Sequence, residues 1–91
     1  LITKALQLSP DDPFIIDSMG WVLYRKGDTA GALTHLQRAF SIRPDPEIAA
    51  HLGEVLWVLG RRDEAKMTWQ AAAKAHPGNE VLAEVIKRFA P

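Results

Sequence analysis

Small residues and prolines recur along this chain at a nearly constant interval. Five pairs of them stand 33 positions apart: Gly20 and Gly53, Gly27 and Gly60, Ala32 and Ala65, Ala39 and Ala72, and Pro44 and Pro77. Ala5 and Pro10 extend the series backwards, since each stands 34 positions before its counterpart, Ala39 or Pro44. An interval of this length indicates an internal structural repeat whose units stack on one another.

Helix start and stop signals divide each interval into two helices. An aspartate followed by a proline opens each unit, at Asp12-Pro13 and at Asp45-Pro46, because a carboxylate caps free N–H groups and proline suits the first helical position. Gly27 and Gly60 suit the ends of the helices that follow. The sequence predicts helices over residues 13–26, 29–42, 46–59, 62–75 and 79–90, and the tail of an earlier helix over residues 1–8.

Two helices per unit of 33 to 34 residues resemble the tetratricopeptide repeat, whose pattern is Trp-x2-Leu-Gly-x2-Tyr, then Ala-x3-Phe, then Pro. The first part corresponds here to Ile16-x2-Met19-Gly20-x2-Leu23 and Ala49-x2-Leu52-Gly53-x2-Leu56, and the second to Ala32-x3-Leu36 and Ala65-x3-Trp69. Small and bulky apolar positions fit, whereas the Trp and Tyr of the pattern are replaced. The resemblance implies an all-α fold: a right-handed α-solenoid of antiparallel helix pairs with a C-terminal capping helix.

This pattern predicts a single domain over residues 1–91. Its expected parts are the end of a preceding repeat (1–10), two repeats (13–45 and 46–78) and the capping helix (79–90). The last helix carries Leu82, Val85 and Phe89 on its packing face and Ile86 where the earlier units have glycine, as expected of an element that ends a solenoid. Because the chain starts at Leu1 within a helical pattern, we expect it to be a fragment of a longer protein.

Composition argues against several classes of function. Eleven Lys and Arg balance eleven Asp and Glu, so no overall positive field favours nucleic acid. Trp21, Tyr24 and Arg25 combine stacking surfaces with a cation, but Asp17 and Glu54 would lie beside them. The longest apolar run, residues 55–59, is too short for membrane insertion.

The sequence shows no arrangement of residues typical of catalysis. His35, His51 and His76 belong to different helices or helix ends, and none has a partner at the spacing of a metal or nucleophile motif. His51 and Glu54 could form a ligand pair or a base with its orienting group, but a solvated polar helix edge is the favoured interpretation. We therefore predict no catalytic residue, no metal, no cofactor and no enzymatic activity.

The first helix of each unit carries a second stripe, apart from the one that packs within the pair. A partner-binding surface is predicted there, with these candidate residues: Phe14, Asp17, Trp21, Tyr24, Arg25, Ala50, His51, Glu54 and Trp57. Two interpretations stay open for the large aromatic residues in it. They pack between neighbouring first helices, or they line the concave surface of the solenoid, where a partner peptide or protein would lie.

The family resemblance implies the second interpretation, because the concave groove is the usual binding surface of tetratricopeptide proteins. It implies an interaction scaffold or adaptor. A clamp for acidic C-terminal tails is disfavoured, since Asp17, Trp21, His51 and residues 80–84 replace the Lys, Asn and Arg of such clamps. Residues 17–28 and 43–65 also resemble the C-terminal repeats of bacterial tetratricopeptide proteins, including outer-membrane lipoproteins of the periplasm. In some relatives such repeats act as adaptors that deliver substrates to a periplasmic protease or assemble it. This favours the cell envelope, with the cytoplasm as the alternative.

Two alternatives to partner binding are a purely structural end of a longer solenoid and a self-association module. A homodimer would form through the apolar residues of the first segment: Leu1, Ile2, Leu6 and Leu8.

Overall fold

The computed structural model describes residues 12–90, which form five α-helices and no strand. They are α2 (Pro13–Arg25), α3 (Thr29–Ile42), α4 (Pro46–Val58), α5 (Arg62–Ala75) and α6 (Glu80–Phe89). The predicted all-α fold is confirmed, and the predicted helix ends agree to within one residue. The predicted helix over residues 1–8, and with it the proposed dimer surface, lies outside the described residues.

Capping side chains explain where several of these helices begin. The Oδ1 of Asp12 accepts hydrogen bonds from the N–H groups of Phe14 and Ile15, at 2.9 and 3.3 Å, and Asn79 caps α6 in the same way. Asp45 occupies the N-cap of α4, but its side chain makes no capping hydrogen bond and its Oδ2 is buried without a partner. The capping role expected for Asp45 is therefore wrong.

Gly31, whose place early in a helix has no explanation in the sequence, lies against the side chain that caps α3. Its N–H donates to Oδ1 of Asp28 at 3.0 Å. A Cβ atom at position 31 would overlap the Asp28 carboxylate. The close approach of this capping side chain therefore favours glycine.

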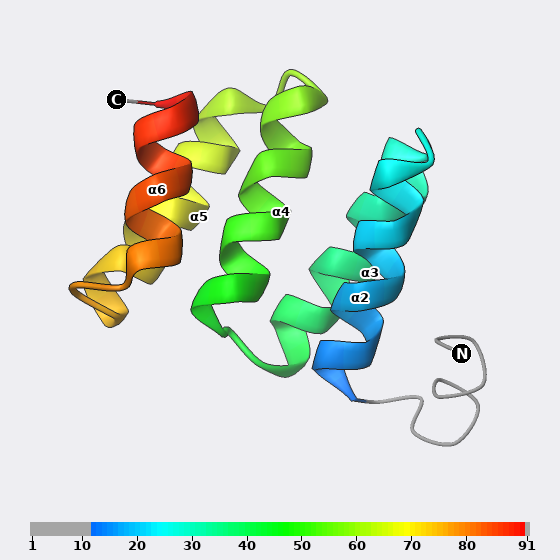
Figure 1. Ribbon diagram of the computed structural model, residues 1–91, viewed down its shortest axis with the longest axis horizontal. Coiled ribbons are helices and arrows are strands. Elements are labelled where there is room, and N and C mark those ends of the chain that lie inside the picture. The colour runs from blue at the N-terminus through cyan, green and yellow to red at the C-terminus, as the bar shows by residue number, and fades with distance from the viewer. Residues whose placement is uncertain (1–11, 91) are drawn as a thin grey trace.

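The helices form two hairpins, α2 with α3 and α4 with α5, and α6 packs against α4 and α5 (Figure 1). The first helices α2, α4 and α6 lie on one face of the molecule, with α3 and α5 behind them (Figure 1). Leu36 of α3 and Trp69 of α5 are fully buried at equivalent positions, against Gly20 and Gly53 respectively. Glycine recurs at these two positions because a large side chain of each second helix packs directly against the backbone of the first helix of its pair.

The last helix packs as its apolar pattern predicts. Leu82 and Val85 are buried, and Phe89 stacks on Trp69 with 5.9 Å between ring centroids. Ile86 stands where the earlier units have Gly20 and Gly53. Because an isoleucine side chain fills that space, no helix can approach α6 there as closely as α5 approaches α4. The capping role of α6 remains a prediction.

Candidate functional site

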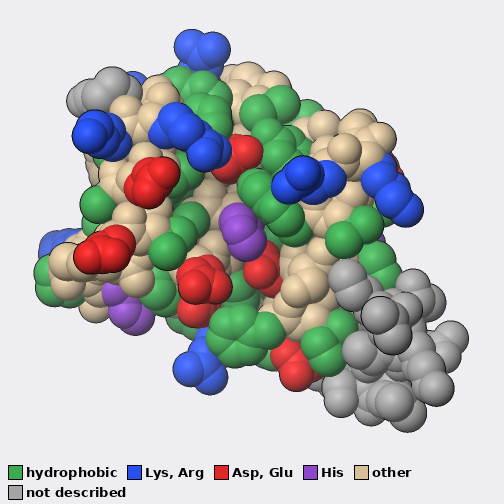
Figure 2. Space-filling model, viewed as in Figure 1, with side chains coloured by type: hydrophobic (Ala, Val, Ile, Leu, Met, Phe, Trp, Pro, Cys, Tyr) green, Lys and Arg blue, Asp and Glu red, His purple; other side chains and the backbone are tan. Residues whose placement is uncertain are grey.

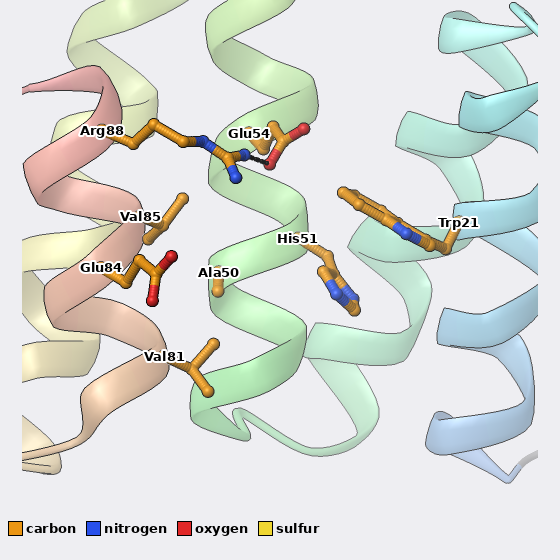
Figure 3. A pocket seen from close by; sticks show the side chains of 8 residues that line it. All are labelled: Trp21, Ala50, His51, Glu54, Val81, Glu84, Val85 and Arg88. Carbon is orange, nitrogen blue, oxygen red and sulfur yellow. Dashed lines mark hydrogen bonds and ion pairs between the residues drawn. The ribbon is translucent and has the colours of Figure 1, made fainter.

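A groove of about 240 Å³ lies between the three first helices. It is lined by Trp21 of α2, by Ala50, His51 and Glu54 of α4, and by Val81, Glu84, Val85 and Arg88 of α6 (Figure 3). The α6 residues stand at positions i, i+3, i+4 and i+7 and therefore share one helix face. Acidic, basic and hydrophobic side chains are interspersed on this side of the molecule (Figure 2). Helix packing thus brings together side chains from three units of the repeat.

Trp21 and His51 form one wall of the groove. Their rings are stacked, with 4.1 Å between centroids and 22° between planes. The Nδ1 of His51 lies 2.9 Å from Oδ1 of Asp17, a carboxylate whose residue is only 7% exposed. Since the carboxylate accepts, Nδ1 carries the proton. The predicted solvated edge at His51 is wrong, because the ring is held between α2 and α4 by stacking and by this hydrogen bond.

Glu54 also bonds across helices rather than to His51. Its Oε1 accepts from Nη2 of Arg88 at 2.6 Å, and its side chain is 12% exposed against 57% for Arg88. The His51–Glu54 pair considered from the sequence is therefore replaced by two pairs that join neighbouring first helices. Both pairs span 34 residues, Asp17 with His51 and Glu54 with Arg88.

Tyr24 lies beside Trp21, with 4.9 Å between ring centroids. Burial raises the pKa of Tyr24 above 10.0, and the Glu54 carboxylate raises it further, by its charge and as a hydrogen-bond acceptor. Because the unfolded chain deprotonates first, this tyrosine stabilises the fold below pH 10.0 and that stabilisation is lost as the pH rises through the folded-state pKa.

Replacing Glu54 by glutamine is expected to lower the Tyr24 pKa, because the carboxylate charge is removed while the Arg88 charge stays. Tyr24 is the single tyrosine of the chain, so the ultraviolet absorbance of its phenolate reports this titration alone. Glu64→Gln is the matched control, since Glu64 pairs with Arg61 on α5. An unchanged Tyr24 titration in Glu54→Gln would contradict the contact.

The remaining predicted residues lie outside the groove. Phe14 is 43% exposed beneath the Arg43 guanidinium, 5.5 Å from its ring centroid, and Arg25 is exposed. Trp57 packs against Trp69 and Phe89, at 5.8 and 6.1 Å between centroids. Packing between neighbouring first helices thus describes Trp57 against Phe89 and also Trp21 against His51, and Trp21 lines the groove as well.

The sequence does not predict most of the α6 side of the groove, because its pattern indicates a helix that caps the solenoid rather than one that lines a binding surface. The residues missed are Val81, Val85 and Arg88, together with the part that Glu84 plays beside them. One sequence signal points to Arg88: it stands 34 positions after Glu54, as His51 does after Asp17. Residues one repeat apart on stacked first helices lie close enough to bond.

Within residues 12–90, no group of three or more His, Cys, Asp or Glu side chains could hold a metal ion. In the same part of the chain, none of the helices has the length and apolar character needed to cross a membrane.

Stacked antiparallel helix pairs with a shared groove on the first helices define a helical repeat protein. No protein-family model matches the chain. It is 57% identical over 54 residues to a TPR repeat-containing protein of Pseudomonas aeruginosa, and the match covers 59% of this chain and 9% of that protein. The matched part of the chain is therefore similar to tetratricopeptide repeats, and the all-helical fold agrees with that similarity. Repeats of this family are generally protein–protein interaction modules rather than enzymes.

Proposed function

We propose that the groove between α2, α4 and α6 binds a peptide segment of a partner protein, so that the chain acts as an interaction scaffold or adaptor. The observation that carries the proposal is the composition of the groove. Buried Ala50 and Val85 form its floor, and Trp21 and the 41% exposed Val81 stand on opposite sides. An aromatic wall over an apolar floor is typical of sites that anchor a partner side chain.

The size of the groove supports a peptide rather than a cofactor. Its volume of about 240 Å³ is below the roughly 300–1,000 Å³ of small-molecule sites. A volume of this size suits an apolar side chain presented by a longer segment. The two inter-helix pairs, Asp17 with His51 and Glu54 with Arg88, hold the walls in place before binding, which lowers the entropy lost when a partner binds.

Selection from a phage-displayed random peptide library on the intact chain tests the proposal. Peptides enriched on the wild type are expected to bind Trp21→Ala about thirtyfold more weakly, because truncating a buried aromatic anchor costs about 2 kcal/mol. Met67→Ala is the control, since Met67 is 69% exposed on α5 and lies outside the groove. Circular dichroism establishes that each variant is folded.

Two results would contradict the proposal. One is a wild-type chain that enriches no peptide, as expected of a purely structural repeat. The other is a folded Trp21→Ala variant that keeps its affinity for every selected peptide, which would place binding elsewhere.

A further inference from the structure

The charges that line the groove do not balance. Two carboxylates, Glu54 and Glu84, face one guanidinium, Arg88, and that guanidinium is bonded to Glu54. His51 does not supply the missing positive charge, because its partner Asp17 makes their pair neutral when His51 is protonated and negative when it is not. Glu84 is therefore uncompensated whether or not His51 is protonated, and Asp17 adds a second negative charge when His51 is neutral.

The acidic character continues along the outer side of α6. A second hollow, which shares Glu84 and Arg88 with the groove, is also lined by Glu80, Ala83 and Lys87. Glu80 and Glu84 lie one turn apart on α6, so their carboxylates face the same side. Lys87 is the single cation of that surface not bonded to Glu54. Lys87 offsets one of the two charges of Glu80 and Glu84, so this surface keeps one uncompensated negative charge.

This charge lies next to the apolar opening of the groove. Val81, 41% exposed, precedes Glu84 by three positions, which places their side chains about 5–6 Å apart on one helix face. In an extended peptide, side chains two positions apart are separated by about 6.6 Å. A bound segment can therefore place an apolar side chain beside Val81 and a basic one beside Glu84.

We infer that the partner segment is apolar and basic: an aliphatic or aromatic side chain enters between Trp21 and Val81, and a neighbouring lysine or arginine pairs with Glu84. This inference rests on the proposed function. A second copy of the chain and an acidic segment are the competing occupants. Charge complementarity favours the basic segment, because an acidic one would meet Glu84 and Glu80 with the same sign.

Two synthetic peptide libraries with blocked termini test the inference. Both carry one fixed phenylalanine. The flanking positions are neutral or basic in one library, and neutral or acidic in the other. Fluorescence anisotropy is expected to show at least about threefold tighter binding of the basic library, and about three- to tenfold loss of that binding in Glu84→Lys, effects of the size expected for one rim ion pair. Glu64→Lys makes the same charge change on α5 and is expected to leave binding unchanged.

The outcomes separate this inference from the proposed function. If both libraries bind equally, or if Glu84→Lys leaves the basic library unaffected while Trp21→Ala weakens it, the inference is overturned and the binding groove stands. Preference for the acidic library also overturns the inference. If the wild type binds neither library, the inference and the proposed function both fail. Sedimentation that shows dimers of the wild type but monomers of Trp21→Ala would assign the groove to a second copy.

Discussion

Replacing Trp69 by alanine is expected to destabilise the fold by about 3–5 kcal/mol, the range for removal of a fully buried aromatic side chain. Trp69 has no exposed surface. Its ring stacks on Trp57 and Phe89, and its Nε1 donates to the Ala50 carbonyl at 3.3 Å. The substitution therefore opens a cavity among α4, α5 and α6 and removes the stacking of Phe89 on Trp69, one of the contacts that join α6 to the preceding pair.

Urea unfolding followed by circular dichroism measures this effect. Trp69→Leu is the control, because Leu36 fills the equivalent position of the preceding repeat, and we expect it to retain part of the lost stability. Since α6 forms one side of the groove, peptide binding should weaken in Trp69→Ala even where the chain remains folded. A loss below about 1 kcal/mol in Trp69→Ala would contradict a core centred on this residue.

Replacing Gly53 by alanine is expected to destabilise the fold by about 2 kcal/mol. A Cβ at this position would overlap the indole of Trp69, with 2.6 Å even to Cδ1, and overpacking of this kind costs about 1–3 kcal/mol. The cost of this overlap lies at the upper end of that range, and the better helix propensity of alanine offsets about 1 kcal/mol of it. Gly20→Ala should cost less, because its nearest contacts, with His35 and Leu36, are 3.0 and 3.1 Å.

A double-mutant cycle identifies the cause. Trp69→Leu should make Gly53→Ala less harmful, because removing the indole removes the atoms that the new Cβ meets. Urea unfolding of the wild type, both single variants and the double variant measures the coupling energy. Additive effects of the two substitutions would show that Gly53 is required for another reason.

The helices were predictable because their signals are local. Proline restricts the backbone at Pro13 and Pro46 whatever the rest of the chain does. Glycine permits the positive φ values of 95° and 85° that Gly27 and Gly60 adopt just after their helices end. The interval of 33 residues indicated stacking because each hairpin leaves an apolar face to be covered. Asp45 was the exception, since a capping hydrogen bond depends on side-chain orientation that the residue type does not determine.

The groove was harder to predict because it depends on contacts between units. Trp21 and Trp57 fall in the same stripe of the helical wheel and both are partly buried, but Trp57 packs against Trp69 and Phe89. Trp21 packs against the smaller His51 and remains beside the groove. The wheel of a single helix contains no information about the neighbours that cover it. Whether the Glu54 carboxylate bonds to His51 or to Arg88 likewise depends on how closely α6 approaches α4.

Titration of the chain with a selected peptide, followed by heteronuclear NMR, tests the central claim most directly. The three tryptophans give separate indole N–H signals. The account predicts that the peptide shifts the Trp21 indole and the backbone amides of Ala50, Val81, Glu84 and Val85, and leaves Met67 on α5 unaffected. Shifts confined to α3 and α5, with the Trp21 indole unchanged, would contradict a binding groove on the first helices.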